Sequence, residues 1–153
     1  LVDRGLARRE RCERRVVVLP VAVDLLLSEH MAELSSPVSK VCFARRTPQI
    51  DYLADAGETA LAARSMLAAP GMEQKAVLRS AWRQLSDLEV ADGELPDNET
   101  AMIQVWRYAP VFADSSRVDD ISLALSLAAI DDERIQLEVD RMFGKEYPWQ
   151  EAL

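Results

Sequence analysis

The sequence contains few of the residues from which metal sites and histidine- or thiol-based active sites are built. Its 153 residues include one histidine, His30, and two cysteines, Cys12 and Cys42. His30 together with Glu33 falls short of the three or four ligands that a zinc site takes. Neither cysteine has a second one at Cys-x-x-Cys spacing, the usual signature of a thiol redox or metal motif. We therefore expect no metal and no cofactor.

Glycine-rich catalytic loops are also missing. The five glycines are isolated from one another, so neither a Walker-type phosphate-binding loop nor a dinucleotide-binding loop is present. The nucleophile elbow Gly-x-Ser-x-Gly does not occur, and the acidic segment 87–99 does not match the ligand spacing of a calcium-binding EF-hand. These absences predict that the protein is not an enzyme. Catalytic carboxylates can also come together only in the folded structure, where the sequence does not reveal them. An enzyme that uses such carboxylates is therefore kept as an alternative.

No apolar run approaches the ~20 residues that span a bilayer. The longest candidate, 16–27, is interrupted by Pro20 and Asp24. Two cysteines are too few for a disulfide framework, and no secretory signal is visible, so we expect a cytoplasmic protein with reduced thiols. The chain begins at Leu1 rather than at methionine, and we expect that it lacks its true N-terminus.

Charge is unevenly distributed along a chain of ordinary globular composition, with 49% hydrophobic and 29% charged residues. Residues 1–46 hold nine Lys and Arg against six Asp and Glu, whereas residues 47–153 hold nine against twenty. An acidic body repels nucleic acid and membrane surfaces, so we expect any phosphate contact to lie in the N-terminal part. We divide the chain accordingly into a basic N-terminal hairpin and helix region, 1–46, and an acidic helical domain, 47–153.

The best-specified stretch is 117–143, which predicts two helices joined by a short turn. Ser116 and Asp119 resemble a capping box for the first helix, which is apolar on nearly every face and therefore expected to be buried. Asp131 is the expected N-cap of the second helix, and Gly144 its left-handed C-cap. We expect the rest of the chain to pack around this helix pair.

Apolar stripes and helix-start signals predict four further helices, at 20–34, 48–67, 72–90 and 99–109. The last is ambiguous, because 103–108 also has the composition of a strand. The segment 38–43 is short and rich in β-branched residues, which favours a strand. The predicted fold is therefore mainly α: a single helical domain of about five or six helices, with a short basic β-hairpin near the N-terminus.

The N-terminal hairpin carries a resemblance to a known family. A strand Leu6-Ala-Arg-Arg, a charged turn and a return strand Arg15-Val-Val-Val-Leu resemble the wing at the end of bacterial winged-helix regulators. The resemblance covers about 20 of the 153 residues. A solvated charged hairpin and a frayed arginine-rich helix are the alternatives that involve no DNA. The resemblance implies that DNA phosphates are contacted by Arg8, Arg9, Arg11, Arg14 and Arg15.

A second resemblance lies in the C-terminal third. The segments Arg107-Tyr-Ala-Pro, Val118-Asp-Asp-Ile-Ser-Leu-Ala-Leu-Ser-Leu and Asp132-Glu-Arg-Ile-Gln are similar to the C-terminal part of uncharacterised bacterial proteins from toxin–antitoxin-type operons. This similarity identifies no catalytic position. It agrees with the regulator-like character of the N-terminal hairpin.

Aromatic residues supply the candidates for a protein interface. Trp82 lies on the apolar stripe of a predicted helix and is expected in the core. Aromatic side chains are enriched at binding hot spots, and the candidate interface residues are Trp106, Tyr108, Tyr147 and Trp149.

Three hypotheses for the function follow. The first is a non-enzymatic regulatory or binding protein of the DNA-binding antitoxin or transcription-regulator kind, whose acidic body binds a protein partner or a second copy of itself. The second is an acidic protein-binding subunit or immunity-like protein with no nucleic-acid contact. The third is the carboxylate-based enzyme mentioned above.

Overall fold

The computed structural model describes residues 7–12, 15–20, 34–91, 97–109, 112–114 and 116–143. The chain forms two compact units. One unit comprises Leu1–Ser35 with Glu146–Leu153, and the other comprises Ser36–Lys145.

In the first unit, a hairpin is formed by β1 (Ala7–Cys12) and β2 (Arg15–Pro20). The strands pair antiparallel, with Ala7 opposite Pro20 and Cys12 opposite Arg15. This confirms the predicted strand–turn–strand pattern. Pro20 is the last residue of β2, so the helix predicted for 20–34 does not begin there, and residues 21–33 lie outside the described residues.

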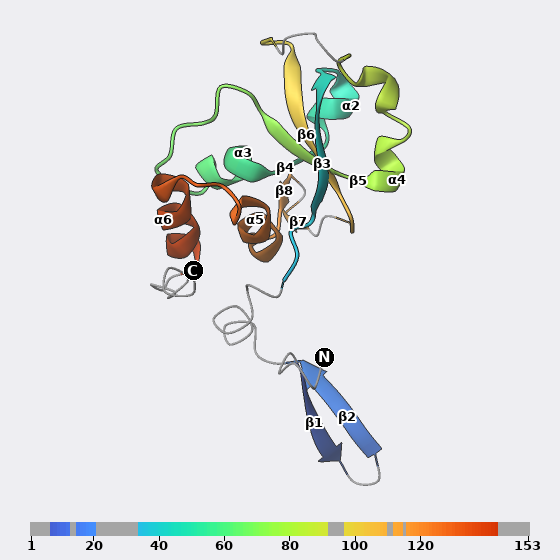
Figure 1. Cartoon of the computed structure of the whole chain (residues 1–153), viewed down its shortest axis with the longest axis vertical. Helices are drawn as coiled ribbons and strands as arrows, with labels where there is room; N and C mark the ends of the chain where they lie inside the picture. Colours follow the sequence, from blue (N-terminus) through green and yellow to red (C-terminus); the bar gives the residue numbers. More distant parts are fainter. Residues whose placement is uncertain are drawn as a thin grey trace. The chain divides into compact units, whose positions relative to one another are not determined.

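The second unit is built on a mixed sheet of six strands, in the order β3-β6-β5-β4-β8-β7 (Figure 1). The pairs β5–β6 and β4–β8 are parallel, and the other three pairs are antiparallel. The strands are β3 (Val38–Arg45), β4 (Ala54–Asp55), β5 (Gln74–Leu78), β6 (Thr100–Trp106), β7 (Phe112–Asp114) and β8 (Arg117–Val118). The unit is therefore a mixed α/β fold, and the prediction of a mainly helical domain is wrong.

Short helices cover this sheet, with α2 and α4 on one side and α3, α5 and α6 on the other (Figure 1). Their bounds are α2 (Pro48–Asp51), α3 (Gly57–Ala62), α4 (Arg79–Trp82), α5 (Asp120–Leu127) and α6 (Glu133–Met142), with a 3-10 helix η3 at Ser86–Leu88. Within the described residues, no helix has the length and apolar character needed to cross a bilayer.

The helices α5 and α6 confirm the predicted helix pair, although Arg117–Val118, expected to begin the first helix, form β8. The predicted capping box at Ser116 is wrong: Asp119 itself caps α5, because its carboxylate accepts a hydrogen bond from the backbone N–H of Ser122 at 2.9 Å. Asp132 caps α6 in the same way through Arg134 N–H, one residue later than the predicted Asp131. The predicted C-cap, Gly144, lies outside the described residues.

Each face of the sheet has its own core. Alternate residues of β5 and β6, including Val77 and Ile103, face the side of α2 and α4, where Ile50 and Trp82 are buried against them. Trp82, only 6% exposed, confirms the prediction that it belongs to the core. On the opposite face the large, fully buried side chains include Leu61, Trp106, Val118, Leu123 and Leu127.

Three of the predicted helices are wrong, for related reasons. The segment 72–90 contains β5 followed by α4 and η3, and the segment 99–109 contains β6. Both strands are buried on both faces, and such strands lack the alternating pattern that distinguishes a strand from a helix. The segment 48–67 is divided into α2, β4 and α3, although α2 begins at Pro48 as predicted, with the Thr47 hydroxyl accepting from Ile50 N–H as its N-cap.

The strand predicted at 38–43 is confirmed as β3, which lies at one edge of the sheet. Its pairing with β6 shifts register between Val38 and Lys40. The other side of β3 is partly covered, since Val90 N–H donates to the carbonyl of Phe43 at 2.8 Å and Lys40 pairs with Glu89 at 2.6 Å. An edge lysine and a register shift are devices that discourage pairing with other chains.

Candidate functional site

The arginines predicted to contact nucleic acid are concentrated on the N-terminal hairpin. Arg8, Arg9 and Arg11 belong to β1, and Arg15 is the first residue of β2. The register places Arg9 opposite Val18, Arg11 opposite Val16, and Arg8 opposite Leu19. Four of the five predicted arginines therefore lie in the paired strands of one hairpin. The fifth, Arg14, lies outside the described residues.

The predicted aromatic interface residues differ in exposure. Trp106 is fully buried, at 0%, and its ring Nε1–H donates to the side-chain oxygen of Gln104 at 3.1 Å. Tyr108 is 41% exposed and meets Trp106 edge-on, with ring centroids 5.9 Å apart, while its hydroxyl lies 3.4 Å from Ser122 Oγ. Of this pair only Tyr108 reaches the surface. Tyr147 and Trp149 lie outside the described residues.

A buried lysine and its carboxylates form a network that the sequence analysis did not identify. Lys75 is 7% exposed, and its ammonium group lies 2.7 Å from Asp55 and 3.6 Å from Glu73. Arg46 extends the network, bridging Asp51 at 3.0 Å and Glu73 at 3.2 Å. Because both cations are paired, the network links α2, β4 and β5. A buried charge needs such partners, and this explains the cluster without a catalytic role.

The opposite face of the sheet buries two amides beside a glycine. Gln74 and Gln104 are each 6% exposed. The side-chain oxygen of Gln74 accepts a hydrogen bond from the backbone N–H of Glu58 at 3.1 Å, and its amide donates to the Glu58 carboxylate at 3.2 Å. Gly57 adopts a left-handed φ of 52° at this point. The amides thus fix the start of α3 on the sheet.

A cavity of about 540 Å³ opens at the end of β3. Both threonine hydroxyls in its wall have structural partners: Thr47 caps Ile50 N–H, and Thr100 donates to the carbonyl of Asp97 at 2.7 Å. Its arginines and carboxylates give it a polar, mixed-charge wall. The lining residues are Arg45, Arg46, Thr47, Leu88, Val90, Asp97, Glu99 and Thr100.

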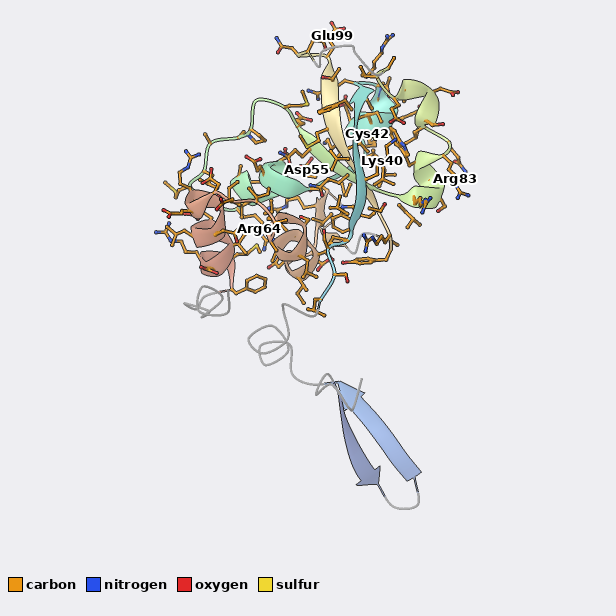
Figure 2. The ribbon with its side chains drawn as sticks, in the orientation of Figure 1. Lys40, Cys42, Asp55, Arg64, Arg83 and Glu99 are labelled. Carbon is orange, nitrogen blue, oxygen red and sulfur yellow. The ribbon has the colours of Figure 1, made fainter. Side chains whose placement is uncertain are left out.

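The thiol of Cys42 is poorly suited to chemistry. It is 6% exposed on β3, facing the core (Figure 2). Burial, with a smaller contribution from the negative charge of Glu89, raises its pKa to about 11. The thiol is therefore protonated at neutral pH, whereas the thiolate is the nucleophile. In the part of the chain that the structure describes, no three His, Cys, Asp or Glu side chains gather as a metal site would require; His30 lies outside that part.

Three exposed arginines of the α/β unit were also not identified from the sequence. Arg79 and Arg83 lie at the two ends of α4, and Arg107 directly follows β6. The one feature of the sequence that could have identified Arg79 and Arg83 is their spacing of four residues. This spacing is not specific, because polar residues on the exposed side of any helix share it.

No family model matches the chain, and the searches of curated proteins and of solved structures also find no match.

Proposed function

We propose that this chain is a non-enzymatic, cytoplasmic regulatory protein of the antitoxin or transcription-regulator kind, which contacts DNA phosphates through the arginines of the β1–β2 hairpin. The observation that carries the proposal is the antiparallel pairing of Ala7–Cys12 with Arg15–Pro20. A two-stranded hairpin is the form that the winged-helix resemblance requires. It holds four arginines within twelve strand positions.

The charge distribution supports the same proposal. The chain as a whole carries a net charge of −8, which disfavours non-specific binding to DNA. The hairpin stretch 7–20 instead holds five arginines against two glutamates. Contacts between arginine and phosphate supply most of the sequence-independent affinity of DNA-binding proteins.

The test is fluorescence anisotropy of a labelled duplex titrated with the full chain at several salt concentrations. Five phosphate contacts predict that the hairpin contributes about −4.5 to the slope of log affinity against log salt, or roughly a 500-fold loss of affinity between 50 and 200 mM salt. Replacing Arg8, Arg9, Arg11, Arg14 and Arg15 with alanine should remove this contribution. The matched control replaces the same five residues with lysine, which retains the charges and should retain most of the binding.

The absence of duplex binding by the wild-type chain at low salt would refute this proposal. Equal binding by the wild-type chain and the five-alanine variant would refute the role of the hairpin.

A second candidate function is an acidic protein-binding or immunity-like subunit that makes no nucleic-acid contact. It is favoured by two almost fully exposed apolar side chains on the α/β unit, Tyr52 at 89% and Met66 at 92%. Tyr and Met are enriched at protein interfaces relative to the rest of the surface. In this case the wild-type chain should not bind the duplex, and Tyr52→Ser with Met66→Ser should weaken self-association or partner binding, measured by sedimentation velocity.

A further inference from the structure

Most of the positive charges in the described part of the α/β unit have a partner within the unit. Its described part contains eleven Lys and Arg. Six of them form ion pairs with carboxylates, and Arg45 and Arg117 also interact with neighbouring groups. The side chains of the remaining three, Arg79, Arg83 and Arg107, are exposed and have no ion pair or hydrogen bond within the described residues.

These three arginines lie at one place in the fold. Leu78 and Trp106 are partners in the parallel pairing of β5 with β6, and Arg79 and Arg107 are the residues that follow them. Neighbouring strands lie about 5 Å apart. The two arginines therefore follow the carboxyl ends of adjacent parallel strands, side by side at the same end of the sheet. Arg83 follows Arg79 by four residues and lies at the outer end of α4 (Figure 2). Residues four apart occupy the same side of a helix.

The helix that carries two of these arginines is anchored in the core. α4 packs on both β5 and β6, and its Trp82 is buried in the core with only 6% exposed. The arginines therefore project from a fixed backbone, which lowers the entropic cost of binding a ligand.

The local charge is positive although the unit is acidic. Along the chain, the carboxylates closest to the two arginines of α4 are Glu73, Asp87 and Glu89. Glu73 is already paired with Arg46 and Lys75, and Glu89 with Lys40, so two of these three carboxylates are compensated by other cations. Two arginines four residues apart repel each other on an isolated helix, and an anion between them would remove that repulsion.

We propose that the surface formed by Arg79, Arg83 and Arg107, the α4 arginine surface, binds the phosphate backbone of duplex DNA. This inference rests on the proposed function, since it supplies a second contact for the same ligand. It also modifies the expectation that the acidic domain makes no phosphate contact. Arginine is suited to this role because its planar guanidinium group donates paired hydrogen bonds to phosphate oxygens.

The test uses the full chain and the same labelled duplex at several salt concentrations. Replacing all three arginines with alanine should reduce the salt slope by about 2 to 3, because each lost phosphate contact changes it by roughly 0.9. Replacing them with lysine should restore most of the slope. All three side chains are exposed, so the variants should keep the wild-type circular dichroism spectrum and melting temperature.

A matched control separates a local contact from a general effect of charge. Arg134→Ala with Arg141→Ala removes two exposed arginines from α6, both of which are paired with carboxylates. Arg79→Ala with Arg83→Ala removes the same number of charges from α4. The α4 double variant should lower the slope by up to about 2, and the α6 double variant should leave it unchanged.

The outcomes distinguish this inference from the proposed function. If the five-alanine hairpin variant loses binding and the α4 variants bind like the wild type, the α4 arginine surface is refuted and the hairpin proposal stands. If the α4 variants lose slope and the hairpin variant does not, the hairpin proposal fails and the α4 surface stands. Equal losses in the α4 and α6 double variants, or no binding by the wild-type chain, would overturn the α4 surface.

Discussion

Replacing Gly57 with alanine should destabilise the α/β unit more than its small change in volume suggests. Gly57 begins α3 with a φ of 52°, in the left-handed region. A Cβ atom at this position would lie 1.9 Å from the side-chain oxygen of Gln74 and 2.8 Å from the side-chain nitrogen of Gln104. Both amides are buried, so neither can move into solvent without disturbing the packing between α3 and the sheet.

The expected cost has two parts. Placing alanine in the left-handed region costs about 1 kcal/mol. Displacing Gln74 breaks its hydrogen bonds with the backbone N–H and the carboxylate of Glu58, at 3.1 and 3.2 Å, and a buried polar group left without a partner costs about 1–3 kcal/mol. The total of about 2–4 kcal/mol is a large fraction of the 5–15 kcal/mol that stabilises a typical domain. It corresponds to a decrease in melting temperature of about 8–20 °C.

Urea and thermal unfolding followed by circular dichroism would measure this effect. Gly71→Ala is the matched control, because no atom lies within 4 Å of the added Cβ and its φ is not in the left-handed region. It should change stability by less than about 1 kcal/mol, and a small gain is expected from the stiffer unfolded chain. If Gly57→Ala and Gly71→Ala unfold within about 0.5 kcal/mol of each other, the argument from the Gln74 contact is wrong.

Three further predictions concern charged and nucleophilic groups. Lys75→Met should cost about 2–3 kcal/mol in urea unfolding by leaving the Asp55 carboxylate unpaired, and adding Asp55→Asn should recover part of that loss; additive losses would contradict the pairing. Cys42, with a pKa raised to about 11 by burial, should resist iodoacetamide at pH 7.5 until urea unfolds the chain, whereas rapid native labelling detected by peptide mass spectrometry would contradict its burial. The hydrogen bond from Arg134 lowers the pKa of Asp132 from 3.8 to about 2, so this carboxylate should stabilise the fold above about pH 4 and lose that contribution as the pH falls towards 2. In an NMR titration, Arg134→Ala should move the Asp132 midpoint back towards 3.8, and an unchanged midpoint would exclude Arg134 as the cause.

The parts of the fold that were predicted correctly depend on local signals. The helix pair α5–α6 was predicted from apolar residues at helical spacing and from carboxylates placed near each helix start, although the N-caps in the structure are Asp119 and Asp132 rather than the predicted Ser116 and Asp131. The second strand of the hairpin could be predicted from a run of β-branched residues that ends at Pro20. In both cases the interactions that determine the structure join residues close together in the chain.

The central sheet could not be predicted in the same way. In β5, Gln74, Lys75, Ala76 and Val77 are all buried, so the strand has no exposed face to mark its period. Gln74 and Lys75 also look like surface residues in the sequence. They are buried because partners from α3 and β4 satisfy them, and those partners are known only once the sheet is assembled.

The same limit applies to the α4 arginine surface. In the sequence, Arg79 and Arg83 belong to the polar side of an amphipathic stripe, and Arg107 lies in a different segment. The parallel pairing of Leu78 with Trp106 brings Arg107 to the end of the strand that leads into α4. The net charge of the region does not reveal that these three arginines lie together, because residues 47–153 are acidic on average. Electrostatic attraction over distances beyond about 8 Å is screened at physiological salt, so the local arrangement of charges, more than the regional sum, determines whether a phosphate can bind there.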